Sequence, residues 1–105
     1  MIPLPAYSPK VNQSKGFAYL LQSEKNGTFY LGWTSDVIRR VEEHNFGEST
    51  YTKTRGPWKL VGVEEFQDHE SAKKRERTLK HNPKMLFLFK KRMISQLSAG
   101  RQVVG

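Results

Sequence analysis

The chain has 105 residues, of which 36% are hydrophobic and 11% are aromatic, a composition typical of a single globular domain rather than a disordered chain. No apolar run approaches the roughly 20 residues that a membrane-spanning helix needs, and the first residues lack the basic and apolar regions of a secretory signal. The chain has no cysteine, which excludes disulfide-linked partners and thiolate zinc sites. This fits a reducing compartment, and we expect a cytoplasmic protein.

The charge of the chain points to an anionic partner. Eighteen Lys and Arg residues against ten Asp and Glu residues give a net charge of +8 and a pI of about 9.9. Such a surface attracts polyanions, and nucleic acid is the leading specific partner. An anionic membrane is disfavoured because no helical segment shows a broad apolar face opposite its basic one. The alternative is a basic surface that serves only solubility.

The hydrophobic and turn patterns predict elements in the order β-β-α-β-α-α. This order favours an α+β domain with a small three-stranded antiparallel sheet flanked by helices. Asn26-Gly27 is a strong hairpin signal, and Asp68 and Asn82 can each cap a helix. In chain order we predict a loosely ordered tail over 1–14, a domain over 15–97 with strands at 16–23 and 28–33, a helix at about 35–45, a polar loop at 47–57, a strand at 58–66 and helices at about 69–81 and 83–97, and a C-terminal tail over 98–105.

The predicted hairpin carries two tyrosines and a glycine on one face. A two-residue turn at Asn26-Gly27 pairs residues whose numbers sum to 53, and alternation then puts Tyr19, Tyr30 and Gly32 on the same side. The tyrosines would lie about four residues apart, on the order of 13 Å between backbones, and could border a site from two sides. The glycine would allow close approach to the backbone. The alternative is ordinary strand tyrosines and a glycine bulge.

The helix after the hairpin places two polar residues on one face. Arg40 and His44 are four residues apart, so they lie one turn from each other. The Arg40 guanidinium can clamp a phosphate or can be solvated, and His44 can shuttle protons, contact phosphate or sit at the helix end near the dipole. Arg39 and Glu43 form the neighbouring pair and are typical of a surface ion pair.

Glu76 is the strongest single signal in the second half of the chain. Ala72 and Leu79 mark the apolar stripe of their helix, and Glu76 falls on that same inward stripe. An inward carboxylate is costly unless it is paired or binds a metal. It can form a salt bridge with Arg40 or a neighbouring lysine, or it can be the single carboxylate ligand of Mg²⁺ in a one-metal site.

Basic residues elsewhere favour a surface that follows a phosphate backbone. Five of the eight residues over 73–80 are Lys or Arg, although such a helix face is solvated in most proteins. We predict nucleic-acid contacts from Gly32, Lys53, Arg55, Lys73 and Lys80.

Several of these residues occur in the order of a known family. The positions concerned are Phe17-Ala18-Tyr19, Tyr30-Leu31-Gly32, Arg40 eight residues after that glycine, His44, and Ala72 four residues before Glu76. Over about 16–92 the chain resembles the GIY-YIG nuclease domain. The first motif keeps only its tyrosine. The chain is most similar to the small stand-alone bacterial members, because it lacks the further domains of the excision-repair endonuclease and the zinc module of the structure-specific nucleases.

The resemblance implies a metal-dependent endonuclease that hydrolyses phosphodiester bonds in nucleic acid, with DNA favoured over RNA as the substrate, and a role in DNA repair. Mg²⁺ or Mn²⁺ on Glu76 would stabilise the leaving 3′-oxygen, and Arg40 would hold the scissile phosphate. Tyr19 would orient or deprotonate the attacking water, assisted by Tyr30 and His44, and a tyrosine base requires nearby cations to lower its pKa from about 10. Alternatives are a catalytically silent nucleic-acid-binding protein of the same fold, or an interaction subunit that docks through residues 85–89.

Overall fold

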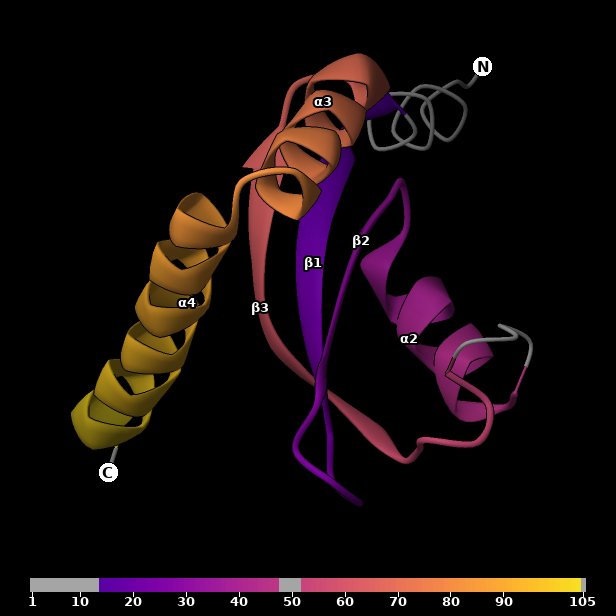
Figure 1. Ribbon diagram of the computed structural model, residues 1–105, viewed down its shortest axis with the longest axis vertical. Helices are drawn as coiled ribbons and strands as arrows, with labels where there is room; N and C mark the ends of the chain where they lie inside the picture. The colour runs from indigo at the N-terminus through magenta and orange to yellow at the C-terminus, as the bar shows by residue number, and fades with distance from the viewer. Residues whose placement is uncertain (1–13, 48–51, 105) are drawn as a thin grey trace, which may run out of the picture.

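The computed structural model describes residues 14–47 and 52–104, which form a three-stranded antiparallel sheet with strand order β2-β1-β3 and three helices (Figure 1). The element order confirms the predicted α+β class. Parts of the predicted N-terminal tail and polar loop, residues 1–13 and 48–51, lie outside the described residues. The elements are β1 (Gly16–Ser23), β2 (Phe29–Thr34), α2 (Val37–Asn45), β3 (Trp58–Phe66), α3 (His69–Lys80) and α4 (Pro83–Val104).

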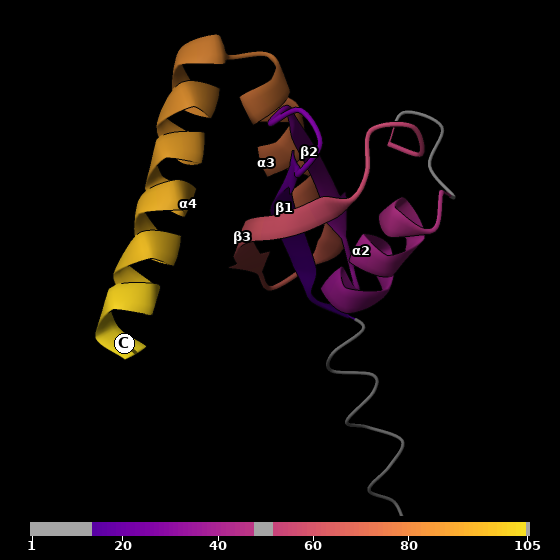
Figure 2. The same cartoon turned by 90° about the horizontal axis from the view of Figure 1, so that it is seen from below.

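The sheet is covered on both faces, by α3 and α4 on one side and by α2 on the other (Figure 2). Side chains of the central strand β1 alternate between the two cores, so Leu20 faces α3 and α4 whereas Tyr19 and Leu21 face α2. The larger core consists of Leu20, Leu31, Val61, Leu79, Phe89 and Met93. The smaller core consists of Tyr19, Leu21 and Trp58, with Tyr30 and Val41 packed against it.

The register of the hairpin differs from the prediction. Tyr19 pairs with Gly32 and Leu21 with Tyr30, so paired numbers sum to 51 and the two-residue turn is wrong. The reason is local: the Ser23 hydroxyl accepts hydrogen bonds from the backbone N–H groups of residues 25 and 26, both at 3.1 Å, and closes a longer loop. A shift of two residues keeps every side chain on its predicted face. It brings the two tyrosines closer together along the strands.

Helices α3 and α4 begin at the expected caps, and α4 ends later than predicted. The Asp36 and Asp68 carboxylates accept the N–H groups that open α2 and α3, and Asn82 does the same for α4 at 3.2 Å. Helix α4 continues to Val104 rather than ending at 97. Extending an existing helix costs little, and Gly100 alone opposes it by only about 1 kcal/mol.

The apolar stretch at the start of α4 is only partly buried. Met85, Leu86 and Phe89 pack into the larger core, whereas Phe87 and Leu88 are 62% and 53% exposed. Most of this stretch therefore stabilises the fold, as expected. Within the described ranges no helix is both long and apolar enough to cross a membrane.

Candidate active site

Tyr19 lies directly across the sheet from Gly32, and the glycine makes room for the phenol. A Cβ atom at position 32 would lie 2.6 Å from the Tyr19 Oη atom and 2.7 Å from its Cζ atom, closer than any side chain tolerates. The predicted close approach to the glycine is therefore made by Tyr19 itself. A contact between Gly32 and nucleic acid stays a prediction.

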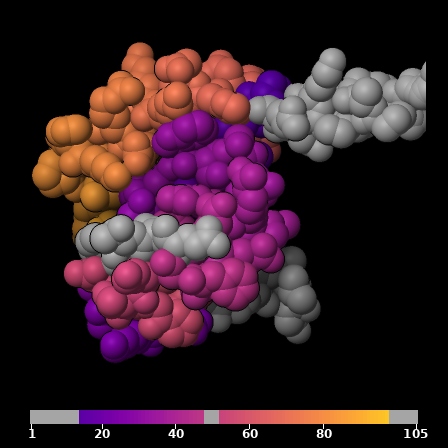
Figure 3. Space-filling model, turned by 90° about the vertical axis from the view of Figure 1, so that its right-hand side faces the viewer, coloured from indigo at the N-terminus to yellow at the C-terminus, as the bar shows by residue number. Residues whose placement is uncertain are grey.

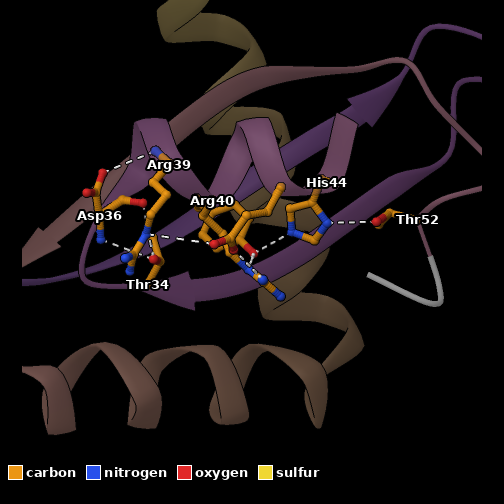
Figure 4. A network of polar contacts seen from close by, with 8 residues as sticks. Thr34, Asp36, Arg39, Arg40, His44 and Thr52 are labelled. Carbon is orange, nitrogen blue, oxygen red and sulfur yellow. Dashed lines mark hydrogen bonds and ion pairs between the residues drawn. The ribbon is translucent and has the colours of Figure 1, made fainter. Parts of the chain in front are cut away.

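The Tyr19 hydroxyl is the centre of a buried polar network on the α2 side of the sheet. It shares a hydrogen bond of 2.8 Å with His44 Nε2 and accepts a longer one, 3.3 Å, from Arg40 Nε. The other ring nitrogen of His44 lies 2.8 Å from the Thr52 hydroxyl. Tyr19, His44 and Thr52 are each 1% exposed or less. Figure 4 shows Arg40 and His44 projecting from the same helix, with Thr52 on the far side of the imidazole.

Burial keeps Tyr19 and His44 uncharged. Desolvation raises the pKa of Tyr19 to about 12, against the opposing hydrogen bond from Arg40. Desolvation also lowers the pKa of His44 to about 4, and the positive charge of Arg40 acts in the same direction. The condition for a tyrosine base, a pKa lowered by nearby cations, is therefore not met at Tyr19, because desolvation outweighs the nearby cation. At neutral pH this phenol is protonated and the imidazole is uncharged.

Arg40 is fixed at its other end by Glu43. Its Nη1 atom lies 2.8 Å from a Glu43 carboxylate oxygen, whereas Arg39 Nε lies 3.8 Å from the other oxygen. The hydrogen bond to Glu43 raises the pKa of Arg40 further above its ordinary value. From the sequence we paired Glu43 with Arg39, but the ion pair between Glu43 and Arg40 is the shorter of the two. Arg40 is 33% exposed, so its outer edge faces solvent.

Tyr30 joins the same cluster from the edge strand. Its ring centroid lies 4.7 Å from that of His44 and 6.3 Å from that of Tyr19. The predicted separation of about four residues is wrong, because the observed register places the two tyrosines side by side. Tyr30 is only partly buried, so it is the more exposed of the two phenols.

Glu76 reaches this region from α3. Ala72 and Leu79 are fully buried and confirm the predicted stripe, while the Glu76 side chain is 21% exposed. Its partner is Lys80, at 2.8 Å, and not Arg40. The Glu76 charge is among the influences that raise the pKa of Tyr19, which places the acid within electrostatic reach of the phenol.

The layout of the elements explains how an acid from α3 meets residues from α2. The two helices lie on opposite faces of the sheet, but β2 is an edge strand, so both flank it (Figure 3). Lys80 Nζ lies 5.9 Å from the centroid of the Tyr30 ring, which connects α3 to this edge. The structure thus brings all five predicted catalytic residues to one region.

The chemistry of Glu76 fits a divalent metal. Among the described residues no group of three or more His, Cys, Asp or Glu side chains could hold an ion. Mg²⁺ is usually held by one or two carboxylates together with waters and substrate phosphates. A single, partly exposed carboxylate that is paired with an exposed lysine can serve as such a ligand.

The predicted phosphate contacts fall into separate groups. Lys80 adjoins Glu76, whereas Lys73 lies nearer the start of α3, 3.5 Å from Glu70 and 5.0 Å from the centre of the Trp33 indole. Lys53 is exposed and follows Thr52, close to the buried network in the chain. Arg55 is half-buried, and its carbonyl accepts a 2.6 Å hydrogen bond from the hydroxyl of Ser23.

Sequence reasoning missed the residues that hold Thr52 in place. The Asn45 side chain bonds the backbone of Trp58 twice, accepting its N–H at 2.7 Å and donating to its C=O at 3.1 Å. The Trp58 indole N–H donates to the Thr52 carbonyl at 2.9 Å. Asn45 directly after His44 was the available signal. Nothing in the threonine-rich loop distinguished Thr52 from its neighbours.

A larger surface hollow lies away from the predicted catalytic residues. It measures about 720 Å³, and none of the predicted catalytic residues line it. Its lining is Lys15, Phe17, Ser35, Asp36, Val37, Ile38, Arg39 and His69.

Residues 15–86 match the family model of the GIY-YIG catalytic domain. The chain belongs to the GIY-YIG family. It is 44% identical over 68 residues to a UPF0213 protein of Listeria monocytogenes, covering 64% of this chain and 75% of that protein. It is 45% identical over 56 residues to a UPF0213 protein of Halobacterium salinarum, covering 52% and 73%.

A solved structure is also similar. The solution NMR structure of a UPF0213 protein from Bacillus halodurans has 35% identity and a TM-score of 0.45, covering 71% of this chain and 82% of that one. Membership of the GIY-YIG family confirms the resemblance seen in the sequence. It places the chain in a nuclease family whose members act on nucleic acid and generally depend on divalent metals.

Proposed function

We propose that the protein is a metal-dependent endonuclease that hydrolyses phosphodiester bonds in DNA at a one-metal site. The observation that carries this proposal is the convergence of Arg40, His44 and Tyr30 around the Tyr19 hydroxyl, with Glu76 close enough to influence its pKa. A cytoplasmic location and a role in DNA repair stay predictions.

Arg40 is the residue that binds the scissile phosphate. Tyr19 and Glu43 hold two of its nitrogens, so the guanidinium is oriented before substrate arrives. Its exposed edge can donate to a phosphate oxygen and offset the charge that develops there. Because this orientation is set by the fold, little reorganisation is needed during the reaction.

Glu76 is the residue that would hold Mg²⁺ or Mn²⁺. When bound, the ion supplies Lewis-acid stabilisation of the leaving 3′-oxygen. Lys80 pairs with Glu76 in the free protein and would release it, because an exposed ion pair one helical turn apart contributes only about 0.3–0.5 kcal/mol.

The two phenols have different roles. Tyr19 is 1% exposed and its pKa is about 12, so it positions Arg40 and His44 rather than serving as a ready base. Tyr30 is the more exposed phenol, and we assign it the contact with the attacking water.

The test is nicking of supercoiled plasmid with Mg²⁺ or Mn²⁺, comparing wild type with Glu76→Gln and with Glu70→Gln. Glu70 is the matched control, because it lies on the same helix and pairs with Lys73 but is 84% exposed. We expect Glu76→Gln to lower the rate about 100-fold or more and Glu70→Gln to leave it nearly unchanged. Metal-dependent nicking that survives Glu76→Gln would overturn the proposal.

The second candidate function is a nucleic-acid-binding protein without turnover. The ion pair between Glu76 and Lys80 and the raised pKa of Tyr19 favour it. Binding without metal-dependent cleavage of any duplex, branched or single-stranded DNA or RNA would select this alternative.

A further inference from the structure

A second pocket, of about 360 Å³, adjoins the candidate active site. It lies between β2, the last turn of α3 and the first turns of α4, and its lining is mostly apolar. Phe29, Leu31 and Leu86 line it from the side of the larger core, and Tyr30 lines it from the edge strand, although the Tyr30 ring packs against the smaller core. The volume falls within the range of roughly 300–1,000 Å³ that is typical of small-ligand sites.

Each aromatic ring of this pocket is accompanied by a lysine. Lys90 Nζ lies 4.9 Å from the centre of the Phe29 ring, and Lys80 Nζ lies 5.9 Å from the centre of the Tyr30 ring. The Phe29 ring with two ammonium groups nearby matches the two parts of a nucleotide, because rings stack on bases and ammonium groups neutralise phosphates. An exposed cation–π contact is weaker than base stacking, so a base can displace the lysines toward the phosphates.

The pocket adjoins the proposed catalytic site through Lys80. This residue lines the pocket and also pairs with Glu76 at 2.8 Å. Tyr30 likewise lines the pocket while its ring lies 4.7 Å from that of His44. A nucleotide in the pocket would therefore lie beside Tyr30 and beside the ion pair of Lys80 with Glu76.

We propose that this pocket receives the base of an unpaired nucleotide beside the cleaved phosphodiester bond. Bases inside a continuous duplex are stacked and cannot reach the rings, whereas an unpaired base can enter without breaking a pair. The substrate class is then DNA with an unpaired nucleotide at the cleavage position. The position relative to the cleaved bond rests on the proposed function, but base binding itself does not.

Binding in EDTA tests the inference without any cleavage. The probes are a short blunt duplex and the same duplex with one unpaired 2-aminopurine nucleotide at its centre, and both are followed by fluorescence anisotropy at fixed salt. We expect the second probe to bind about fivefold more tightly or better, which corresponds to the lower end of stacking on one aromatic ring. Its 2-aminopurine fluorescence should fall on binding, because the base stacks.

Two kinds of variant locate the effect. Phe29→Leu keeps an apolar side chain where Phe29 packs against the larger core but removes the ring. Lys90→Ala and Lys91→Ala are a matched pair, because the two lysines are neighbours on α4 but Lys91 is exposed and does not line the pocket. We expect Phe29→Leu and Lys90→Ala to reduce the preference for the unpaired probe to about twofold or less, and Lys91→Ala to retain it.

Equal affinity for the two probes, or an unchanged 2-aminopurine signal, would overturn the inference. An equal change of the preference in Lys90→Ala and Lys91→Ala would also overturn the inference. These two variants test the inference even if Phe29→Leu does not fold. Plasmid nicking with no preference for unpaired DNA would remove the base pocket and leave the nuclease proposal standing. Preferential binding of the unpaired probe without any cleavage would leave the base pocket standing and remove the nuclease proposal.

Discussion

The two sides of the candidate site are built differently. On the α2 side, Tyr19, His44 and Thr52 form a buried, uncharged chain of hydrogen bonds, each 2.8 Å long. On the α3 side, Glu76 and Lys80 form a charged pair that is partly exposed. A buried network is costly to disturb and holds one geometry, whereas an exposed pair is weak and exchanges partners readily. The first arrangement suits positioning of a phosphate-binding arginine, and the second suits binding and release of a metal.

The largest effect on stability should come from removing a buried hydrogen bond on the α2 side. Thr52→Val keeps the shape of the side chain but removes the hydroxyl that His44 contacts, leaving a buried ring nitrogen without its partner. We expect a loss of about 1–3 kcal/mol in the free energy of unfolding, measured by urea denaturation. Thr52→Ser keeps the hydroxyl and should recover most of the loss. Equal losses in the two variants would mean that packing, and not the hydrogen bond, matters at this position.

A pH-dependent effect of similar size should come from titrating His44 on the α2 side. The pKa of His44 is lowered from 6.5 to about 4 in the folded protein, so the unfolded chain binds the proton more readily. The contribution of His44 to the free energy of unfolding is therefore fully present above about pH 6.5 and is lost as the pH falls toward 4. We expect a decline of about 1–3 kcal/mol across this window.

Urea unfolding at several pH values measures this decline. His44→Gln cannot titrate in this range and should show a flatter profile between about pH 6.5 and pH 4. A profile as steep as that of the wild type would assign the decline to other groups.

The smallest effect should come from the α3 side. Lys80→Met removes the ion pair with Glu76 but keeps a long apolar stem over Tyr30. We expect a change of less than about 0.5 kcal/mol in the free energy of unfolding, because the pair is exposed. A loss as large as that of Thr52→Val would contradict the contrast between a fixed and an exchangeable side.

Local spacing made much of this site predictable. Arg40 and His44 were placed on one face by their separation of four residues, and Glu76 was placed by the apolar stripe of its helix. These relations lie within single elements, where helix geometry fixes the neighbours. The α+β order followed from hydrophobic periodicity for the same reason.

What could not be predicted depends on contacts between elements. The hairpin register changed because the Ser23 hydroxyl closes a longer loop, which no two-residue turn rule includes. Thr52 gained its role only when the loop folded against His44. The raised pKa of Tyr19 arises from burial, which sequence spacing does not give.

The most direct test of the central claim is an NMR titration of the protein with paramagnetic Mn²⁺. If the acid of α3 and the phenols of the hairpin share one metal site, Mn²⁺ should broaden signals of Glu76 and Tyr30 first, and Glu76→Gln should abolish that broadening. Broadening that persists in Glu76→Gln, or that centres on the larger hollow at the start of α2, would contradict a metal site at this position.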